Sequence, residues 1–327
     1  MLRVAILGAS GIASSHIASC RRVPGVEVCA IYSRSLERAE RVARVNEVST
    51  ATDELDGLLS QDDIQAVIIA TEPSRHIDLA LRVMRYRKHL LIEKPIDTDY
   101  SKAVGFARSV SDYDGTVSVV SQYRFNSELQ EMKHCLAGME GQSLLVNLQV
   151  FKSRNPDYYE FGNGWRQNES DYFVNQAYHW LDVLNWYFGD PVEVHALSLD
   201  GRSDVKCVDR SVAILRYANG SLATIAGGSF SGVRAPVNFV IFGKGQVIDY
   251  GKPTRPSLVN SVLGRLVPAR WYQSSKQQRP SALDLQIQDF VTAINSKCQP
   301  STTVDQAISA LRLSLSISGR MKYSDAL

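Results

Sequence analysis

The chain has 327 residues, of which 44% are hydrophobic and 21% are charged, and this balance is that of a globular protein. Its length exceeds a single ordinary core, so we expect two domains. The formal net charge is only +2, and Arg and Lys are spread along the chain, so we expect no nucleic-acid partner. No apolar stretch approaches the roughly 20 residues of a membrane helix, so we expect no membrane partner either.

Two further features bear on the compartment and on metals. The apolar N-terminus stops at Gly8, well short of the hydrophobic region of a signal peptide, so we interpret it as mature protein. The five cysteines are odd in number, widely spaced and without metal-ligand spacing, which fits reduced thiols in a cytoplasm. We therefore expect a cytoplasmic protein without a metal site.

The first 123 residues alternate apolar, β-branched runs with helical segments. This pattern is typical of a parallel sheet covered on both faces, the doubly wound dinucleotide-binding fold. It predicts an α/β class protein whose residues 1–123 form a Rossmann domain. The expected strands are Leu2–Leu7, Val26–Tyr32, Ala66–Ala70, His89–Ile92 and Thr116–Ser121, and the expected helices are Ile12–Arg22, Ser35–Val45, His76–Arg85 and Tyr100–Ser109.

After about Arg124 the strands become longer, and Asn219-Gly220 predicts a hairpin turn because this pair tolerates positive φ. Hairpin-linked strands form an antiparallel sheet, so residues 124–327 are expected to form an α+β domain. The segment Lys252–Pro280 is expected to be an irregular excursion. The expected strands are Leu144–Phe151, Val192–Leu199, Val208–Tyr217, Ser221–Gly228 and Val237–Phe242, and the expected helices are Ser127–Leu136, Ala282–Ser296 and Val304–Tyr323.

A glycine cluster lies directly between the first expected strand and the first expected helix. Its residues are Gly8, Ala9, Ser10, Gly11, Ile12 and Ala13. Binding of a pyrophosphate needs a tight turn, a bare backbone beside the anion, and a helix N-terminus with free N–H groups. Gly8 can supply the turn, Ala13 the close contact between helix and strand, and Ser10 stands where a middle glycine is usual. An ordinary strand-to-helix turn is the alternative, but the position in a complete βαβ unit favours a dinucleotide site.

The end of the second strand indicates which dinucleotide is bound. An NAD site usually has a carboxylate there for the ribose 2′-hydroxyl. This chain instead has Ser33 and Arg34, and no acid before Glu37. A guanidinium suits a 2′-phosphate, so NADP(H) is favoured and NAD(H) stays possible; an exposed arginine beside the helix cap Ser35 is the alternative interpretation.

Further motifs follow in order along the chain. They are Thr71-Glu72-Pro73-Ser74-Arg75-His76, Lys88 to Pro95 with the signature Glu93-Lys94-Pro95, Tyr123-Arg124-Phe125-Asn126, Asn175-Gln176-Ala177-Tyr178-His179-Trp180-Leu181-Asp182, Gln286 to Phe290, and Ser318-Gly319-Arg320. In this order and spacing they resemble the Gfo/Idh/MocA oxidoreductase family, which includes glucose–fructose oxidoreductase and inositol dehydrogenase. The resemblance covers essentially the whole chain.

The resemblance implies catalysis at a substrate hydroxyl or carbonyl, with Lys94 and His179 as the catalytic residues. It implies a C-terminal domain with an open, mostly antiparallel sheet that forms a homodimer or homotetramer. It also implies that Thr71, Pro73, His76, Glu93 and Lys94 lie at the cofactor.

One position departs from the family pattern. Asn175 stands where the family commonly has Asp, four residues before His179. An Asn-Gln-x-x-His helix resembles the branch that acts at the sugar 3-position of nucleotide-linked hexuronic acids and related 3-keto sugars. Asn175 can hydrogen-bond a substrate there but cannot act as an acid or base.

The residue pattern around His179 agrees with a site on a helix. Asn175, His179 and Asp182 fall at i, i+4 and i+7 on one polar stripe, opposite an apolar stripe. A plain amphipathic helix is the alternative, so the alignment of all three carries the prediction. Lys94 follows an apolar strand, at the carboxyl end of the sheet where open α/β folds bind ligands.

Other residues are expected to contact substrate. The loop before this helix carries Arg154, Tyr158, Tyr159, Trp165 and Arg166, whose aromatic faces suit a sugar ring and whose guanidinium groups suit a phosphate or carboxylate. A packed surface loop is the alternative for any one of them. Arg124 is expected either to reach the cleft or to tie the two domains together.

Together these features predict hydride transfer between nicotinamide and a secondary alcohol or ketone of a sugar or nucleotide-sugar. Lys94 stabilises the substrate oxygen, and His179 takes or gives the proton. An inositol, a dihydrodiol or a free aldose is the alternative substrate. The alternative of another class is a non-catalytic NAD(P)-sensing regulator, against which the presence of both Lys94 and His179 argues.

Overall fold

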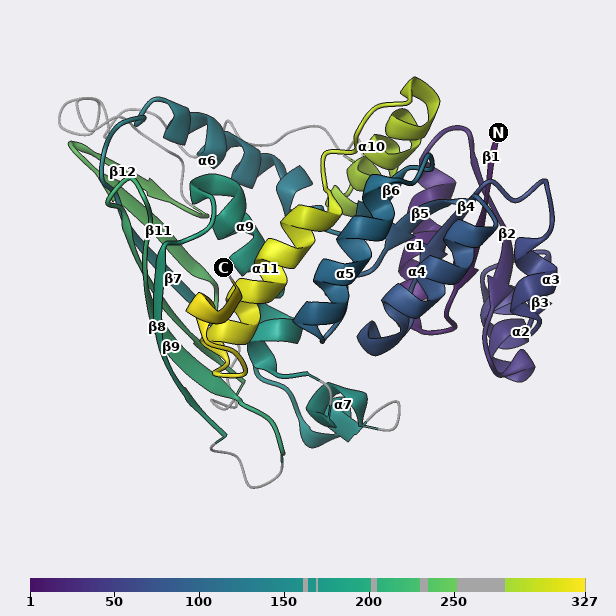
Figure 1. The fold of residues 1–327 in the computed structure, drawn as a ribbon, viewed down its shortest axis with the longest axis horizontal. Coiled ribbons are helices and arrows are strands. Elements are labelled where there is room, and N and C mark those ends of the chain that lie inside the picture. The colour runs from purple at the N-terminus through teal and green to yellow at the C-terminus, as the bar shows by residue number, and fades with distance from the viewer. Residues whose placement is uncertain (161–163, 169, 201–204, 230–234, 252–279, 327) are drawn as a thin grey trace, which may run out of the picture.

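The computed structural model describes residues 1–327 except 161–163, 169, 201–204, 230–234, 252–279 and 327. Two six-stranded sheets stand at opposite ends of the molecule, and α11 (Val304–Ile317) runs between them (Figure 1). This helix packs against elements of both halves, among them α5 (Tyr100–Ser111) and α9 (Tyr178–Phe188). The expected α/β class with a second, α+β half is confirmed.

The first sheet is parallel and has the order β3-β2-β1-β4-β5-β6. The order reverses at β1, which makes the carboxyl ends of β1 and β4 a crevice for a ligand. Helix α3 and strand β3 were missed, because Thr50–Thr52 is too short and too exposed to form an apolar run. The strands are β1 (Leu2–Leu7), β2 (Val26–Tyr32), β3 (Thr50–Thr52), β4 (Ala66–Ile69), β5 (His89–Ile92) and β6 (Val117–Val119), and the helices are α1 (Gly11–Arg22), α2 (Leu36–Val45), α3 (Leu55–Leu59), α4 (His76–Arg85) and α5.

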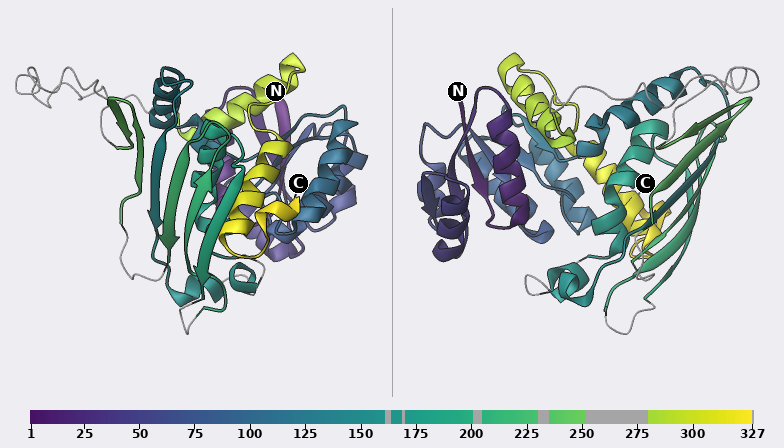
Figure 2. Two further views of the ribbon diagram at one scale, coloured as in Figure 1. Left: turned by 60° about the vertical axis from the view of Figure 1, so that its left-hand side comes forward. Right: turned by 180° about the vertical axis from the view of Figure 1, so that it is seen from behind.

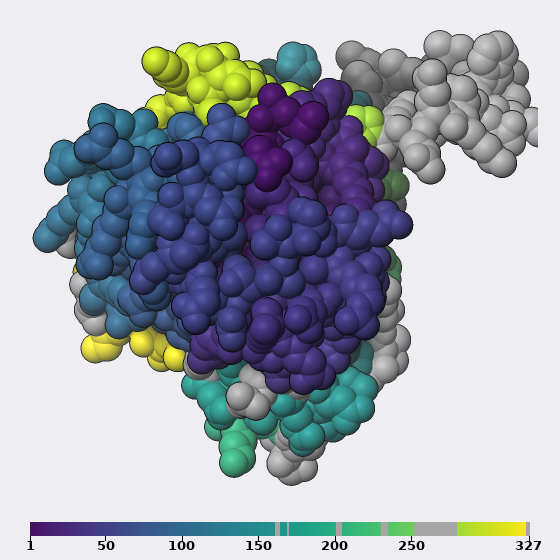
Figure 3. All heavy atoms as spheres, turned by 90° about the vertical axis from the view of Figure 1, so that its right-hand side faces the viewer, coloured from purple at the N-terminus to yellow at the C-terminus, as the bar shows by residue number. Residues whose placement is uncertain are grey.

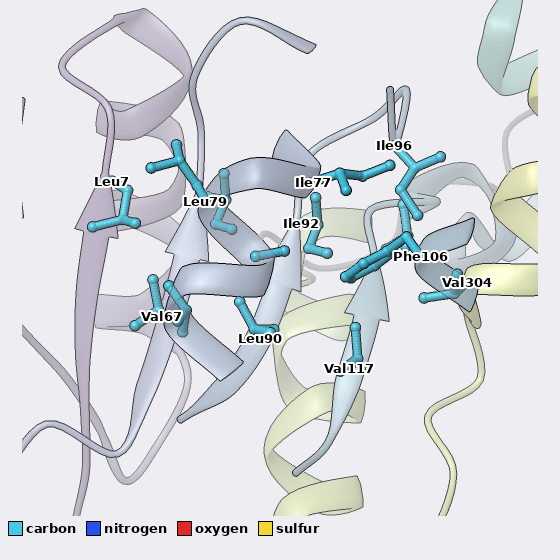
Figure 4. Close-up of a cluster of buried hydrophobic side chains, with 14 of the residues drawn as sticks. Leu7, Val67, Ile77, Leu79, Leu90, Ile92, Ile96, Phe106, Val117 and Val304 are labelled. Atoms are coloured by element: carbon cyan, nitrogen blue, oxygen red, sulfur yellow. The ribbon is translucent and has the colours of Figure 1, made fainter. Parts of the chain in front are cut away.

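Both faces of this sheet are buried, as the continuous apolar strands predict. Neighbouring residues of β1 enter separate cores: Leu7 packs with α4 and α5, and Ile6 packs with α1 and α10 (Ala282–Ser296). Figure 4 draws the first of these cores, with Leu90 and Val117 of the sheet facing Phe106 of α5. A rigid, doubly covered sheet thus holds the loops at its carboxyl edge.

The second sheet has the order β12-β11-β7-β10-β9-β8, and every pair is antiparallel except β7 with β10. The prediction of an open, mostly antiparallel sheet is confirmed. The Asn219-Gly220 hairpin forms between β9 and β10, although only Gly220 has a positive φ. The strands are β7 (Leu145–Phe151), β8 (Glu193–Leu199), β9 (Arg210–Arg216), β10 (Leu222–Gly228), β11 (Asn238–Gly243) and β12 (Gln246–Asp249), of which β12 was not expected.

The C-terminal helices depart from the expected organisation in two ways. The helix expected over Val304–Tyr323 ends at Ile317, because Gly319 takes a φ of +71° and breaks it. Helix α10 returns to the first half of the chain, where Figure 3 shows its yellow-green atoms beside the purple N-terminal residues, and it packs against α1. Asp284 of α10 accepts two 2.8 Å hydrogen bonds from Arg22 of α1. The division of the chain into two domains at residue 124 stays a prediction. Helix α10 belongs to the second domain in sequence but packs on the first.

Three further helices complete the described part: α6 (Ser127–Ala137), α7 (Pro156–Glu160) and α8 (Trp165–Asn168). The expected excursion at Lys252–Pro280 lies, except for Pro280, outside the described residues. Among the helices that are described, none is long and apolar enough to cross a bilayer.

Candidate functional site

The glycine turn has the geometry of a phosphate cradle. Gly8 has a φ of +130°, and a Cβ added there would lie 2.2 Å from the carbonyl oxygen of Ala70, so only glycine fits. Ser10 precedes α1 as its N-cap, yet its side chain makes no capping hydrogen bond. A Cβ added to Gly11 would meet no atom within 4 Å, so open space lies before the helix N-terminus. Free N–H groups facing open space suit the pyrophosphate of a dinucleotide.

The loop after β2 is ordered by its own hydroxyl groups. Ser33 Oγ accepts a hydrogen bond from the Ser35 N–H, and Ser35 Oγ caps α2 by accepting from the Arg38 N–H. Arg34 projects from this loop, and its Nη2 lies 3.6 Å from the Glu72 Oε1. The Arg34 side chain is exposed, and it has an acidic partner that the sequence pattern did not indicate.

His76 braces two loops at the carboxyl edge of the first sheet. Its Nδ1 lies 2.9 Å from the Pro95 carbonyl oxygen, and its Nε2 lies 3.1 Å from that of Thr71. The side chain is fully buried, and this burial lowers the pKa of the ring. His76 therefore holds the cofactor-side loops together and has no exposed surface for a cofactor, which corrects its expected contact. Pro73 begins the short 3₁₀ helix that lies between Thr71 and His76.

Glu93 and His16 form a buried pair behind Lys94. Glu93 accepts a 2.8 Å hydrogen bond from His16 Nε2 and a 3.0 Å bond from the Lys94 N–H. Burial by itself would raise the pKa of Glu93, but the hydrogen bond from His16 and the nearby positive charges hold it at about 2. Glu93 is thus an anion that ties α1 to the Lys94 loop.

Lys94 extends from the end of β5 to the second half of the chain. Its Nζ donates a 2.9 Å hydrogen bond to the backbone carbonyl of Asn175. Burial lowers the pKa of Lys94, whereas the neighbouring Glu93 raises it. The carbonyl that it contacts belongs to a turn of π-helix at Phe173–Ala177, a distortion that is frequent at functional sites.

His179 lies one turn beyond Asn175, in α9. Its ring is stacked on Tyr123, with centroids 4.6 Å apart and planes 18° from parallel. Burial, and next the charge of Lys94, lower the pKa of His179 to about 3, so the imidazole is neutral at physiological pH. In the described structure the His179 Nδ1 is buried and has no hydrogen-bond partner. A neutral imidazole beside an ammonium group can accept the proton of an alcohol.

Asp182 does not face this site. Both of its carboxylate oxygens accept hydrogen bonds from Arg124, at 2.6 and 2.9 Å, and both side chains are buried. Arg124 also donates to Gln306 of α11. The pair thus connects the chain crossing to α9 and α11. This corrects the expected contact of Asp182 with substrate, and it agrees with the second of the two interpretations of Arg124, a tie between the two halves.

The rim of the site contains a stack of arginine and aromatic side chains. The guanidinium carbons of Arg154 and Arg166 lie 4.7 and 4.6 Å from the centre of the Tyr158 ring, and Arg166 also lies 4.5 Å from the centre of Trp165. Arg154 donates to Gln176, the neighbour of Asn175, and Gln176 donates to the Tyr158 hydroxyl. This network links the rim directly to the π-helical turn.

Tyr159 differs from its neighbour. It is buried, and its hydroxyl lies 2.7 Å from the Ser229 hydroxyl in a small core with Val205 and Cys207. Tyr159 is therefore a packing residue, which corrects its expected contact with substrate. Tyr158 lies in the stack at the rim.

Sequence reasoning missed His16, Tyr123 and Asp171. Asp171 is buried and accepts hydrogen bonds from the N–H groups of Phe173 and Val174, so it caps the π-helical turn. Ser318 of the C-terminal motif also donates to it, at 2.7 Å. A signal existed for His16, since it lies on the apolar face of α1. The burial of Asp171 depends in part on Ser318, which lies 147 residues further along the chain.

A metal site was not expected. Within the described ranges, no group of three or more His, Cys, Asp or Glu residues is arranged to hold a metal ion.

Comparison with known proteins agrees with this architecture. Residues 2–121 match the oxidoreductase family with an NAD-binding Rossmann fold (Gfo/Idh/MocA), and residues 129–249 match the C-terminal domain of the same family. Inositol 2-dehydrogenase of Mycolicibacterium gilvum is 26% identical over 90% of this chain and 83% of its own length. Inositol 2-dehydrogenase 2 of Mycolicibacterium vanbaalenii is 27% identical over 67% of this chain, and the match spans 64% of that protein.

Among solved structures, the WlbA dehydrogenase of Bordetella pertussis, in complex with NADH and UDP-GlcNAcA, has the same fold. It superposes with a TM-score of 0.83 over 100% of this chain and 97% of its own, at 20% sequence identity.

Proposed function

Because the chain belongs to the Gfo/Idh/MocA oxidoreductase family, we propose that it transfers a hydride between a nicotinamide and a secondary alcohol or ketone carbon of a sugar-like substrate. One observation carries this proposal. Lys94 of the first half reaches the turn before His179 of the second, and its charge acts on the His179 ring. An ammonium and a neutral imidazole therefore serve one site at the carboxyl edge of the parallel sheet.

The nicotinamide, when bound, supplies the hydride acceptor or donor. In the oxidation direction the substrate hydroxyl donates to His179, which accepts its proton as general base. The Lys94 ammonium stabilises the negative charge that develops on the substrate oxygen. Asn175 hydrogen-bonds the substrate beside these groups. In the reduction direction, His179 first takes up a proton from solvent, since its ring is otherwise neutral, and then gives it to the substrate oxygen.

We propose a sugar or nucleotide-sugar as the substrate, and oxidation at its 3-position as the finer hypothesis. The stack of Tyr158, Trp165, Arg154 and Arg166 supports this class, since aromatic rings pack on sugar faces and guanidinium groups bind carboxylates or phosphates. An inositol or a free aldose is the second candidate, because the two curated relatives described above are inositol 2-dehydrogenases.

The cofactor is a nicotinamide dinucleotide, NADP(H) or NAD(H). The bare turn at Gly8 and the open N-terminus of α1 would hold its pyrophosphate. Arg34, in the loop after β2, favours a 2′-phosphate and hence NADP(H), and NAD(H) stays possible.

We further propose that two copies of the chain associate through the second sheet. Helices cover only one side of this sheet in the described structure (Figures 1 and 2). The other side carries exposed apolar residues on six strands. Exposed apolar residues gathered on one uncovered side of a sheet support an interface there. Its members are Leu145, Leu197, Leu199, Val212, Ile214, Leu222, Phe242 and Val247.

The test is turnover of a panel of sugars, nucleotide-sugars and polyols with NAD⁺ and NADP⁺. Lys94→Ala and His179→Ala are each expected to lower kcat/KM by about 100-fold or more, with cofactor binding retained. The matched controls Lys244→Ala and His134→Ala replace exposed residues and should keep full turnover. Cofactor binding without turnover of any panel member would instead favour a non-catalytic sensor. Losses below about tenfold in both site variants would refute the assigned roles.

A further inference from the structure

An ion pair connects the two loops that flank the phosphate turn. Arg34 follows β2 and Glu72 follows β4, and these two strands lie on either side of β1. The Arg34 Nη2 and the Glu72 Oε1 are 3.6 Å apart. Since β1 ends in the turn at Gly8, the pair joins the two walls of the crevice in which a dinucleotide would lie.

The position of the pair relates to the adenosine ribose. In a doubly wound fold, the group at the end of β2 faces the ribose 2′-substituent, which is a hydroxyl in NAD(H) and a phosphate in NADP(H). A guanidinium at this point attracts a 2′-phosphate. A carboxylate within salt-bridge distance of that guanidinium competes for it and repels the phosphate, whereas a 2′-hydroxyl carries no charge to repel.

We propose that Glu72 is a selectivity residue that opposes NADP(H) by pairing with Arg34, and that Arg34 is the group that would otherwise bind the 2′-phosphate. The proposal deepens the proposed function and rests on it, because it assumes that a nicotinamide dinucleotide occupies the turn.

The local structure suits this role. The Glu72 backbone is fixed, since its carbonyl accepts a 3.0 Å hydrogen bond from the Arg75 N–H and Pro73 follows it. The side chains of Arg34 and Glu72 keep exposed fractions of 64% and 33%, so both can be reached by a nucleotide. An exposed pair of this kind contributes little to stability, so removing it leaves the fold intact.

The experiment measures dissociation constants of the full-length protein for NAD⁺ and NADP⁺ by calorimetry. Glu72→Gln is expected to tighten NADP⁺ binding by about fivefold or more and to change NAD⁺ binding less than about twofold. Arg34→Gln is expected to weaken NADP⁺ binding, and Glu72→Gln should gain less in that background than in the native one. Added salt should reduce the gain.

Glu40→Gln, which removes an exposed carboxylate on α2, is the matched control for net charge. It should leave the ratio of the dissociation constants for NADP⁺ and NAD⁺ unchanged. An unchanged ratio in Glu72→Gln, an equal gain for both nucleotides, or an equal gain with and without Arg34 would overturn the proposal. Failure of the native protein to bind either nucleotide would instead refute the proposed function, so the two failures are distinguishable.

Discussion

Lys94 Nζ donates a 2.9 Å hydrogen bond to the backbone carbonyl of Asn175, 81 residues further along the chain. The bond ties the end of β5 to the π-helical turn that leads into His179. An ammonium group has three N–H donors, and this bond uses one of them. The contact therefore orients Lys94 toward the second half of the chain while leaving donors for a substrate oxygen.

Glu93→Gln is expected to move the alkaline limb of the kcat/KM profile to lower pH. Burial lowers the pKa of Lys94 and Glu93 raises it, so loss of the Glu93 charge leaves the lowering by burial unopposed. The ammonium then loses its proton at lower pH, and activity that needs the charged lysine is lost there. The measurement is kcat/KM for alcohol oxidation against pH, with Asp78→Asn, at an exposed carboxylate paired with Lys102, as the control. A limb that stays in place or moves upward would contradict the role of Glu93.

Gly8→Ala is expected to destabilise the protein by about 3 kcal/mol or more, because the added methyl group would overlap the Ala70 carbonyl at a strained backbone angle. Gly11→Ala is the matched control three residues later. Its methyl group meets no atom within 4 Å at the first position of α1, so a change within about 0.5 kcal/mol is expected. Urea unfolding of both variants measures the difference. A loss in Gly8→Ala as small as that in Gly11→Ala would show that the turn tolerates a side chain in spite of its close contact with Ala70, the residue after β4.

Much of the fold was predictable because its signals are local. The strands of the parallel sheet are apolar runs bounded by glycine or polar residues, and β1, β2 and β5 agree with the expected bounds. Strand β3 has no such run, and its place comes from pairing with β2. The end of α11 depends on Gly319, whose positive φ outweighs an apolar pattern that continues beyond it.

The site was harder to predict, because side-chain partners come from far along the chain. Asp182 lies on the polar stripe of α9, yet Arg124, 58 residues earlier, buries it in an ion pair. Tyr158 and Tyr159 are adjacent and chemically alike, and only the packing of α7 decides which one enters the core. The pairing of Glu72 could likewise not be predicted, because its partner Arg34 lies in the loop after another strand, β2.

Asp182→Ala is expected to destabilise the protein by about 3–5 kcal/mol, since it leaves the buried Arg124 charge without its partner. Glu193→Ala, which breaks an exposed pair with Arg216, should cost less than about 1 kcal/mol. Thermal and urea unfolding measure both values. Because Asp182 does not face the site, the KM of the folded variant should stay near the native value; a large rise in KM with native stability would return Asp182 to the substrate contacts.

Ile214→Glu is expected to convert the proposed dimer into monomers. Ile214 lies in β9 with 55% of its surface exposed, on the uncovered side of the second sheet. It is opposite His195 of β8, and Val212 of its own strand is opposite Leu197. A carboxylate placed there would be desolvated in an interface and would oppose a like charge if the contact is two-fold symmetric. Light scattering coupled to size exclusion measures the mass of the native chain and of the variant. Leu285→Glu, at an exposed apolar residue of α10, is the control and should keep the native mass. A native protein that is monomeric would refute the association, and an oligomer that persists in Ile214→Glu would place it elsewhere than on this sheet.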